Sequence, residues 1–379
     1  MKICHITSAH NRYDARIFKR ECVSLAKEPS NEVVLVCCDG KPYEFKDGIQ
    51  ITSYSSTKLS KKERFRLLFS NKTLVNYLLT INADIYQFHD IELIEVGRKL
   101  SRKGRCVVFD SHENWPGYIA ELVAKPYSWC YKFVVQLIEF YYRRVFHKFS
   151  AIYSVSPNMV NDLQRLTSTP VFFVPNYPFS HDISPISSQD KKNKFIYQGT
   201  VYGISNQETI VKALQKIEGE VSYNVVGLIS EQLKAEMQQL DCRKSVEFTN
   251  WVSPIELEQI MNECLAGIVV LDYSPVCCGK EGQLGSNKIF EYMKMGLPVI
   301  CTDFDLWQSM IIGKYNCGIA IPPQDEDKMI EAINFFLSHK EEAIEMGRRG
   351  QQAVVKEFCW ELFEQEFVIR YNTIANNGK

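Results

Sequence analysis

The sequence predicts two α/β domains, each built on a doubly wound parallel sheet and joined by one linker. Three observations predict this: a length of 379 residues, short β-branched runs that alternate with longer helical patterns, and one stretch where the alternation stops. A chain of this length exceeds one ordinary hydrophobic core, so about two domains are expected. Regular alternation of strand and helix is the pattern of a parallel sheet covered by helices on both faces.

The first half of the chain contains seven predicted strands and four helical patterns. Each strand is a short β-branched or apolar run, and each helix has apolar residues three to four positions apart. The predicted strands are Lys2–Thr7, Glu32–Cys37, Ile49–Tyr54, Ile85–His89, Cys106–Ser111, Ala151–Val155 and Val171–Val174. The predicted helices are Ala15–Lys27, Lys61–Thr80, Ile91–Lys103 and Pro126–Phe149.

The alternation stops at Pro175–Asn193, which is rich in Pro, Ser, Asp and Lys and shows no periodicity. It restarts with predicted strands at Lys194–Tyr197, Ser222–Val226, Val246–Thr249, Ile268–Leu271 and Pro298–Thr302. Helices are expected at Gln207–Ile217, Glu231–Gln239, Pro254–Asn262, Lys288–Met295 and Lys356–Ile374. We therefore expect a first domain at 1–178, a linker at 179–193, a second domain at 194–355, and a C-terminal helix in 356–379 that packs back on the first domain.

The composition disfavours several classes of protein. A formal net charge of −1 gives no overall attraction to nucleic acid. The 13 cysteines are scattered without a CxxC pair, which disfavours a disulfide framework or a zinc site and favours a reducing, cytoplasmic compartment. The N-terminus lacks the apolar core of a signal peptide, and no stretch is long enough to span a membrane.

The strongest chemical signal is a Gly–Ser–Asn turn that leads into a short helix. The free backbone N–H groups from Ser286 through Asn287 and Lys288 to Ile289 form an anion site at the helix start, and Lys288 adds a positive charge. Glu291, one turn further, is placed to accept hydrogen bonds from a ribose diol. This geometry suits a nucleoside diphosphate. The alternative is a plain capped helix with a surface Lys–Glu pair.

This segment, Ser286–Ile300, resembles the donor-binding segment of glycosyltransferase family 4, whose members are retaining enzymes with the GT-B fold. Segments in the same order as in bacterial surface-polysaccharide members extend the resemblance over most of the chain: Asp14–Lys27, Phe88–Asp90, Phe109–Glu113, Val174–Pro178 and Tyr197–Thr200. The resemblance implies two Rossmann-like domains that face a central cleft. It also implies a nucleotide-sugar donor on the second domain and an acceptor on the first.

The resemblance also assigns donor-side residues. The family's first acidic residue, eight positions before Glu291 and associated with the transferred sugar, is replaced here by Gln283, and Glu281 lies two positions away as a substitute. Gly199 and Thr200 correspond to the glycine turn that opens the second domain. Many members carry an Arg soon after that glycine, which this chain lacks. Lys288 is therefore expected to carry more of the diphosphate charge than in those members.

On the first domain the resemblance places His112 near the sugar-transfer centre, so that His112, Glu291 and Gln283 are the candidate catalytic residues. The alternative for His112 is a strand-end histidine satisfied by a backbone carbonyl. Candidate acceptor-side residues lie at the ends of predicted strands and in the loop after the first one: His10, Asp14, Arg16, His89 and Asp90. For Asp14, capping of the following helix is at least as good an interpretation.

No metal or organic cofactor is expected. Asp303 and Asp305 have the form of a metal-binding DxD, but the resemblance implies a transfer without bound metal, and loop solvation and capping explain both carboxylates.

Pro126–Phe149 combines aromatic and basic residues, including Trp129, Lys132, Arg143 and Arg144, and a second basic stretch is Lys58–Arg66. Such a composition at helical spacing suits an anionic bilayer surface, here the cytoplasmic face of the inner membrane. The alternative is a helix packed on its own sheet with a solvated basic edge.

These expectations combine into one hypothesis: a glycosyltransferase that moves a hexose or N-acetylhexosamine, with retention, from a UDP- or GDP-sugar. The acceptor would be a lipid-linked saccharide in O-antigen or capsule synthesis. Two alternatives stay open. One is a non-catalytic partner that binds nucleotide sugar, and the other is a nucleotide-sugar epimerase, since GT-B-like architecture also serves that reaction.

Overall fold

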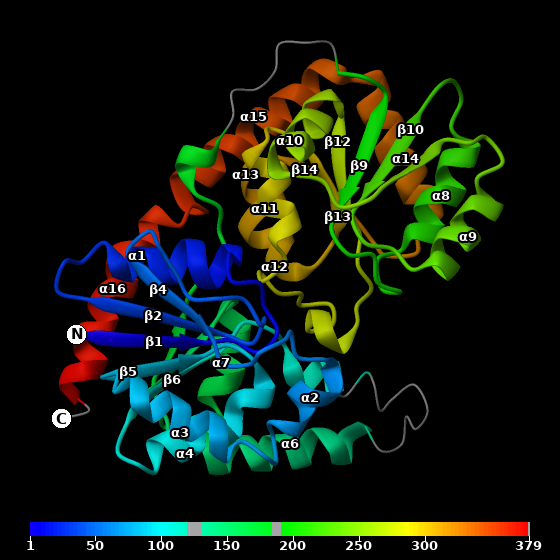
Figure 1. Ribbon diagram of the computed structural model, residues 1–379. Helices are drawn as coiled ribbons and strands as arrows, with labels where there is room; N and C mark the ends of the chain where they lie inside the picture. Colours follow the sequence, from blue (N-terminus) through cyan, green and yellow to red (C-terminus); the bar gives the residue numbers. More distant parts are fainter. Residues whose placement is uncertain (120, 122–130, 184–190, 378–379) are drawn as a thin grey trace. The chain divides into compact units, whose positions relative to one another are not determined.

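The computed structural model describes residues 1–119, 121, 131–183 and 191–377. The chain divides into two compact units. The first is Met1–Asn176 with Phe363–Lys379, and the second is Tyr177–Leu362. Each unit has one central sheet with helices on both faces (Figure 1), so the predicted α/β fold class with doubly wound sheets is confirmed.

The sheet of the first unit has the strand order β3-β4-β2-β1-β5-β6-β7-β8. Neighbouring strands pair in parallel, except that β3 is antiparallel to β4. The strands are β1 Lys2–Ile6, β2 Glu32–Cys37, β3 Glu44–Lys46, β4 Ile49–Ser53, β5 Ile85–Phe88, β6 Cys106–Ser111, β7 Ala151–Ser154 and β8 Val171–Phe173.

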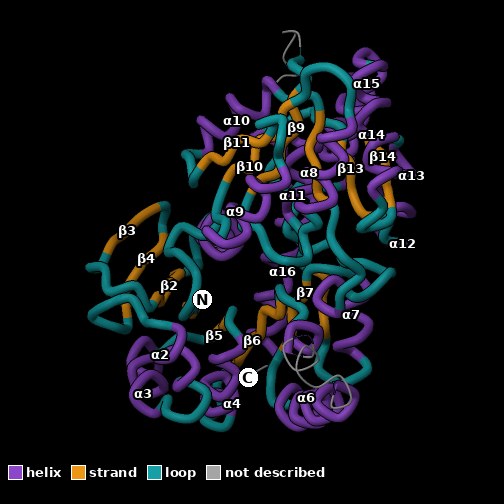
Figure 2. The backbone as a smooth tube through the Cα atoms, turned by 90° about the vertical axis from the view of Figure 1, so that its right-hand side faces the viewer, coloured by secondary structure: helices purple, strands orange, loops and turns teal. Residues whose placement is uncertain are grey.

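Helices cover both faces of this sheet (Figures 1 and 2). One face packs on α3, α4 and α6 through apolar residues that alternate along the strands, such as Cys4 and Ile6 of β1. The opposite face meets η1, which is a π-helix, and α16. The helical segments are η1 Ala15–Cys22, α1 Val23–Ala26, α2 Lys61–Arg66, α3 Lys72–Ile81, η2 Ile91–Leu93, α4 Ile94–Ser101, α6 Tyr131–Phe146, α7 Pro157–Gln164 and α16 Glu361–Asn377.

One sequence prediction for the first unit is corrected, and two elements, β3 and α7, were not predicted. The helix predicted at Lys61–Thr80 is two helices, because the chain turns at the end of α2 and Asn71 donates its side-chain N–H to the Leu67 carbonyl at 2.7 Å. The short edge strand β3 was not predicted, because three partly exposed residues carry no apolar alternation. Residues 126–130 of the predicted aromatic helix, Trp129 among them, lie outside the described residues.

The second sheet has the order β11-β10-β9-β12-β13-β14, with every neighbouring pair parallel. Its strands are β9 Lys194–Gln198, β10 Ser222–Val226, β11 Val246–Thr249, β12 Ala266–Val269, β13 Val299–Thr302 and β14 Gly318–Ile321. Helices α8 and α14 cover one face, and α11, backed by α15, covers the other.

The helical segments of the second unit range from three residues to 18 residues in length. They are η4 Ser180–Asp182, α8 Gln207–Lys216, α9 Glu231–Leu240, α10 Pro254–Glu263, η5 Pro275–Cys277, α11 Asn287–Lys294, α12 Asp305–Trp307, η6 Gln308–Ile312, α13 Gly313–Tyr315, α14 Glu326–Ser338 and α15 Lys340–Glu357. Among the described residues, none of the helices of either unit is both long and apolar enough to span a bilayer.

The long helix predicted at Lys356–Ile374 is corrected. The chain leaves α15 at Phe358, and Phe358, Cys359 and Trp360 are buried before α16 begins. The Trp360 N–H donates to the Pro178 carbonyl at 2.8 Å, which fixes the break by a tertiary contact that periodicity does not reveal. Strand β12 starts two residues earlier than predicted, and β14, α14 and α15 were not predicted.

Candidate functional site

Two glycines bring the ends of β9 and β10 into close contact in the second unit. Gly199 has φ +102° and Gly227 has φ +135°, conformations that side chains other than glycine rarely adopt. A Cβ on Gly227 would lie 2.4 Å from the Gly199 carbonyl oxygen. A Cβ on Gly199 would lie 3.2 Å from Cε of Lys288. The glycines therefore leave the space that the Lys288 side chain occupies.

Lys288 is a cation without an acidic partner in the described part of the chain. Its Nζ lies 5.4 Å above the ring centre of Tyr197, which offers only a cation–π contact. The side chain is partly buried, and this desolvation lowers the pKa of Lys288. A desolvated ammonium without a carboxylate is costly for the protein alone and is suited to an anionic ligand.

The start of α11 adds to this positive site. Ser286 is the N-cap residue, but its side chain makes no capping hydrogen bond, and the first turn holds no acidic residue. The leading N–H groups of a helix carry partial positive charge and accept anions when no cap occupies them. Asn287 is exposed, whereas Ile289 is buried and anchors the turn.

Glu291 pairs with Lys294, whose Nζ lies 2.9 Å from its carboxylate, and not with Lys288. The side chain of Glu291 is 30% exposed, so part of the carboxylate stays open to a ligand. The sequence alternative of a surface pair between Lys288 and Glu291 is therefore not what the structure contains.

Gln283 and Glu281 lie in the loop before α11. The Gln283 side-chain oxygen accepts a hydrogen bond from the Gly285 N–H, and its backbone carbonyl accepts one from the Trp307 indole at 2.9 Å. Glu281 is exposed. Thr200 accepts a hydrogen bond from the Tyr197 hydroxyl through its carbonyl at 3.0 Å, which fixes the turn after Gly199. Asp303 pairs with Lys280 at 2.5 Å, and Asp305 opens α12.

In the first unit, polar side chains form a row across one face of the sheet. His5 on β1, Gln87 on β5 and Asp110 on β6 point away from the apolar core, as does His89 just after β5. Strand residues two apart share a face, so this row follows from the register of β1, β5 and β6. All four side chains are buried.

Arg16 of η1 holds Asp110 in a bidentate pair, with Nε 2.8 Å from Oδ2 and Nη2 2.7 Å from Oδ1. Arg16 also donates to the Val174 carbonyl at 3.0 Å and to Asn176 at 2.9 Å. Burial alone would raise the pKa of Asp110, but the charge and hydrogen bonds of Arg16 hold it well below its usual range. Arg16, predicted on the acceptor side, is thus a buried partner of Asp110.

Asp14 caps the helix that carries Arg16. Its carboxylate accepts from the backbone N–H groups of Arg16 at 2.8 Å and Ile17 at 3.0 Å. The capping interpretation of Asp14 therefore describes its contacts in the structure.

His10 and Asp90 form a second pair at the same edge of the sheet. His10 Nδ1 lies 3.0 Å from Asp90 Oδ1, and Asp90 Oδ2 accepts from Thr7 Oγ1 at 2.9 Å and from the Ser8 N–H at 2.7 Å. Burial lowers the pKa of His10, but the hydrogen bond and charge of Asp90 outweigh it and raise that pKa to about 9. At neutral pH, His10 is therefore an imidazolium held by a buried carboxylate.

This pair predicts a pH-dependent stability. Folding raises the pKa of His10 from 6.5 to about 9. The contribution of the His10–Asp90 pair to the free energy of unfolding is therefore fully present below pH 6.5 and is lost as the pH rises through about 9. The full effect is at most on the order of 3 kcal/mol. Urea unfolding of wild type and His10→Gln should show a stability gap at pH 6 that shrinks by pH 9.5. Exposed His147→Gln is the control, and a gap independent of pH would contradict the assignment.

His112 stands next to both pairs. Its Nδ1 lies 3.3 Å from Asp110 Oδ2, and its ring meets the His10 ring edge to face with 5.0 Å between centroids. Its side chain is 10% exposed, whereas His89 is wholly buried. The structure therefore brings His10, His112 and Asp90 together at the carboxyl edge of the sheet and leaves His89 beneath them.

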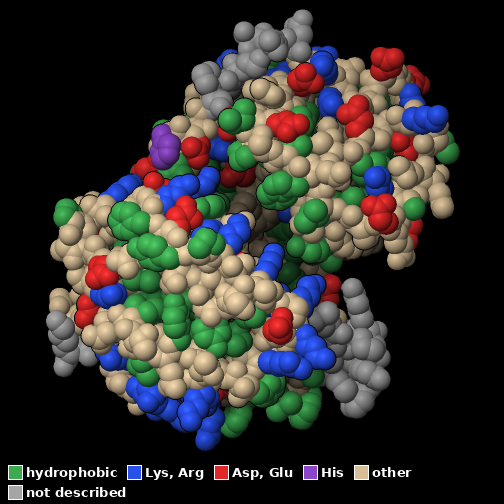
Figure 3. Space-filling model, viewed as in Figure 1, with side chains coloured by type: hydrophobic (Ala, Val, Ile, Leu, Met, Phe, Trp, Pro, Cys, Tyr) green, Lys and Arg blue, Asp and Glu red, His purple; other side chains and the backbone are tan. Residues whose placement is uncertain are grey.

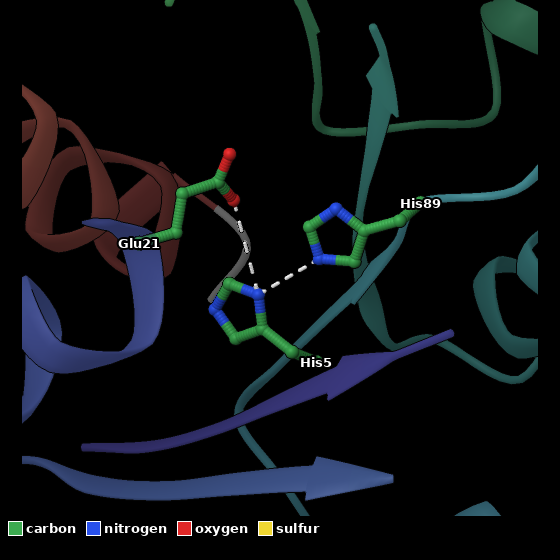
Figure 4. A group of neighbouring side chains, drawn as sticks. All are labelled: His5, Glu21 and His89. Carbon is green, nitrogen blue, oxygen red and sulfur yellow. Dashed lines mark hydrogen bonds and ion pairs between the residues drawn. The ribbon is translucent and has the colours of Figure 1, made fainter. Parts of the chain in front are cut away.

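His5, Glu21 and His89 form a compact buried cluster with potential metal-ligand atoms within 4.8 Å of one another (Figure 4). His5 Nδ1 lies 3.0 Å from His89 Nε2, which is a hydrogen-bond distance. The Arg16 guanidinium already lies 3.1 Å from Glu21 Oε1 and supplies positive charge there. His5 and His89 are thus hydrogen-bonded to each other, and Glu21 is paired with Arg16.

Sequence reasoning missed His5, Glu21 and Asp110 as members of this site. The sequence did carry a signal for His5, which is a polar residue between the buried Cys4 and Ile6 in a strand. Its side chain lies on the face of the sheet opposite to theirs, and a buried imidazole there needs a hydrogen-bond partner. Glu21 and Asp110 gave no comparable signal, since their partner Arg16 lies on another element.

One protein-family model matches the chain within the second unit. Residues 180–353, slightly under half of the chain, match the model described as Glycosyl transferases group 1. No curated protein matches the sequence.

Solved structures match the whole chain at low identity. Sucrose-phosphate synthase from Thermosynechococcus elongatus is 15% identical with a TM-score of 0.77, covering 98% of both chains. Anabaena HepE in complex with UDP and glucose is 13% identical with a TM-score of 0.69, covering 98% of this chain and 100% of the other. The lipopolysaccharide outer core galactosyltransferase WaaB is 16% identical with a TM-score of 0.61 and the same coverage as HepE. The chain thus has the GT-B fold, and its residues 180–353 match the group 1 glycosyl transferase model.

Proposed function

We propose that this protein is a glycosyltransferase that moves a hexose or N-acetylhexosamine from a UDP- or GDP-sugar to a lipid-linked saccharide of a bacterial surface polysaccharide, with retention. The group 1 domain and the UDP-bound fold neighbour HepE support the nucleotide-sugar donor. WaaB, a lipopolysaccharide galactosyltransferase, supports the class of acceptor. Donor binding is assigned to the second unit and acceptor binding to the first.

The observation that carries the proposal is the unpaired ammonium of Lys288 at the uncapped start of α11, within the described residues. A diphosphate would take hydrogen bonds from the N–H groups of Asn287 and Ile289 and a charge-assisted contact from Lys288. Glu291, one turn further, would accept from the ribose hydroxyls. As the sugar leaves, negative charge grows on the diphosphate, and the same preorganised donors stabilise it without reorganising.

The experiment is mass spectrometry of the purified chain with UDP- and GDP-sugars, with and without lipid-linked saccharide acceptors. We expect a glycosylated acceptor whose new linkage keeps the anomeric configuration of the donor. An epimer formed without acceptor would overturn the proposal in favour of an isomerase. Binding without turnover across the panel would favour the non-catalytic alternative, for which the replacement of the family's acidic residue by Gln283 is the specific argument.

We further propose that the first unit attaches to the anionic inner membrane surface through α6. The buried side of α6 packs Tyr142, Val145 and Phe146 into the core. Its outer side exposes an apolar stripe at helical spacing, made by Phe133 (62% exposed), Leu137 (51%) and Phe140 (63%). Figure 3 shows Lys and Arg side chains at the lower edge of this unit. Lys132, Arg143 and Arg144 of α6 are exposed. Apolar residues with flanking cations suit a bilayer interface.

This attachment predicts a specific loss. Phe133→Ser with Phe140→Ser should reduce cosedimentation with vesicles containing anionic phosphatidylglycerol by about tenfold, because two aromatic anchors are removed. Nucleotide affinity should not change. The matched control is Tyr43→Ser with Phe45→Ser, which removes two exposed aromatics near β3. Equal binding by both double variants would contradict the assignment of α6.

A further inference from the structure

The loop that leads into α11, Lys280–Gly285, is held by the corner Asp303–Trp307, where the chain leaves β13 and forms α12. Each of the three residues of α12 donates a hydrogen bond to a carbonyl of this loop. The pairs are Asp305 N–H to Lys280 at 3.1 Å, Leu306 N–H to Glu281 at 3.0 Å, and the Trp307 indole N–H to Gln283 at 2.9 Å. The start of α12 is therefore satisfied by the loop, whereas the N-cap side chain of α11 makes no such bond.

Side chains of the corner tighten the same contact. Lys280 Nζ lies 2.5 Å from Asp303 Oδ2 and donates to the Asp303 backbone carbonyl at 2.6 Å, and the Tyr273 hydroxyl donates to Oδ1. Gly282 has φ +76°, and a Cβ there would lie 2.4 Å from Cβ of Phe304. Phe304 is buried, and close packing leaves it no room to move aside. The loop therefore has one position against the corner.

Helix α11 is anchored by a different set of contacts. Its residues Ile289, Phe290 and Tyr292 are wholly buried, and the Tyr292 hydroxyl accepts from the Gln198 N–H of β9 at 3.0 Å. The position of the helix start thus depends on the second sheet, whereas the position of the loop depends on the corner. A change at the corner can displace the loop and leave the helix start in place.

The ligand that is proposed for α11 divides at the same point. With the diphosphate at the helix start and the ribose on Glu291, the nucleoside extends along α11. The sugar is attached to the other end of the diphosphate and so lies on the side where the loop arrives. Gln283 is on that side. Its side-chain oxygen accepts from the Gly285 N–H, which leaves its NH₂ group as the donor end.

We propose that the corner Asp303–Trp307 positions the transferred sugar by fixing the loop Lys280–Gly285, while α11 alone binds the nucleotide. The inference rests on the proposed function for the identity of the ligand and on the contacts above for the separation of the two halves. Phe304 and Trp307 are positioning residues, because they hold the loop and do not touch the ligand. Asp303, whose two carboxylate oxygens receive Tyr273 and Lys280, belongs to this clamp.

Two glycines provide a matched test. Gly279 and Gly282 both have a left-handed φ, +63° and +76°, but a Cβ on Gly279 would meet nothing within 4 Å. Gly282→Ala therefore pushes the loop off Phe304, whereas Gly279→Ala adds only the backbone cost. The probes are UDP-glucose, UDP-N-acetylglucosamine and GDP-mannose, each compared with bare UDP or GDP. We expect Gly282→Ala to weaken binding of the sugar nucleotide about threefold to tenfold more than binding of the bare nucleotide, the range for one hydrogen bond.

Calorimetric titration of the full chain measures both affinities, and Gly279→Ala should leave their ratio unchanged. A folded Gly282→Ala protein with the wild-type ratio, whether both affinities fall or neither does, would overturn the proposal. Absent sugar transfer together with the expected change in the ratio would count against the proposed function alone. A wild-type protein that binds none of these ligands would overturn both.

Trp307 gives a second readout in the wild-type chain. Its indole signal in the ¹⁵N–¹H NMR spectrum is assigned by its loss in Trp307→Phe. Because its acceptor is the Gln283 carbonyl, the sugar nucleotide should shift this signal more than the bare nucleotide does. The buried Trp360 of the same unit, assigned by Trp360→Phe, is the control and should not distinguish the two ligands. Equal shifts of the Trp307 signal would contradict the proposal. If either Gly282→Ala or Trp307→Phe does not fold, the other experiment still decides it.

Discussion

Lys288→Met is expected to weaken binding of the nucleoside diphosphate about tenfold to 150-fold. The substitution keeps the length and apolar packing of the side chain over Tyr197 and removes only the charge. A charge-assisted contact contributes about 1.5–3 kcal/mol, which corresponds to this range. The effect on kcat should be at least as large, because charge on the leaving diphosphate grows in the transition state. Calorimetric titration with UDP and GDP measures the first effect.

The same variant should not be less stable than wild type. Lys288 is desolvated, its pKa is lowered by burial, and no described acidic residue pairs with it, so its charge costs folding free energy. We expect an unchanged or higher melting temperature together with lost binding, as at sites where function opposes stability. Lys314→Met removes an exposed lysine paired with Glu357 and serves as the control. Undiminished nucleotide affinity in Lys288→Met would remove this lysine from the donor site.

Glu291→Gln is expected to weaken nucleotide binding about fivefold to a hundredfold, because a neutral amide accepts more weakly from the ribose hydroxyls than a carboxylate does. Deoxyribose analogues separate this cause from others. UDP should lose affinity on Glu291→Gln, whereas 2′,3′-dideoxy-UDP, which lacks the diol, should bind both proteins alike. The measurement is again calorimetric titration.

Unlike the lysine variant, Glu291→Gln should also lower the melting temperature. It removes the partner of Lys294, whose side chain is only 10% exposed, and leaves that ammonium unpaired. Glu331→Gln breaks a Lys–Glu pair of the same spacing on an exposed part of α14 and should change neither quantity measurably. Equal losses for UDP and the dideoxy analogue in Glu291→Gln would show that its effect is structural only.

Much of the fold could be predicted from local pattern. The strands at Glu32–Cys37, Cys106–Ser111, Ser222–Val226 and Val246–Thr249 have the predicted bounds, because each is a short β-branched or aromatic run with turn residues at its ends. Prediction failed where specific hydrogen bonds, one local and one tertiary, override periodicity. The breaks at Asn71 and at Phe358–Trp360 depend on hydrogen bonds to Leu67 and Pro178, which no periodicity reveals.

The candidate site could likewise be predicted from the sequence only in part. Lys288, Glu291 and Ser286 could be proposed from sequence because they lie within one helical turn or two of each other. The contacts of these residues could not be proposed from sequence. Glu291 pairs with Lys294, and only the folded sheet places Gly199 beside Lys288. In the first unit, Arg16 and Asp110 are 94 residues apart, and only the register of β1, β5 and β6 brings their elements together.

The most direct measurement is a crystal structure of the full chain with UDP or GDP at saturating concentration. The account predicts phosphate oxygens within hydrogen-bond distance of the backbone N–H groups at the start of α11 and of Lys288 Nζ, with the ribose hydroxyls on Glu291. A nucleotide bound at another edge of the second sheet, with no phosphate oxygen within hydrogen-bond distance of Lys288 Nζ, would contradict this account.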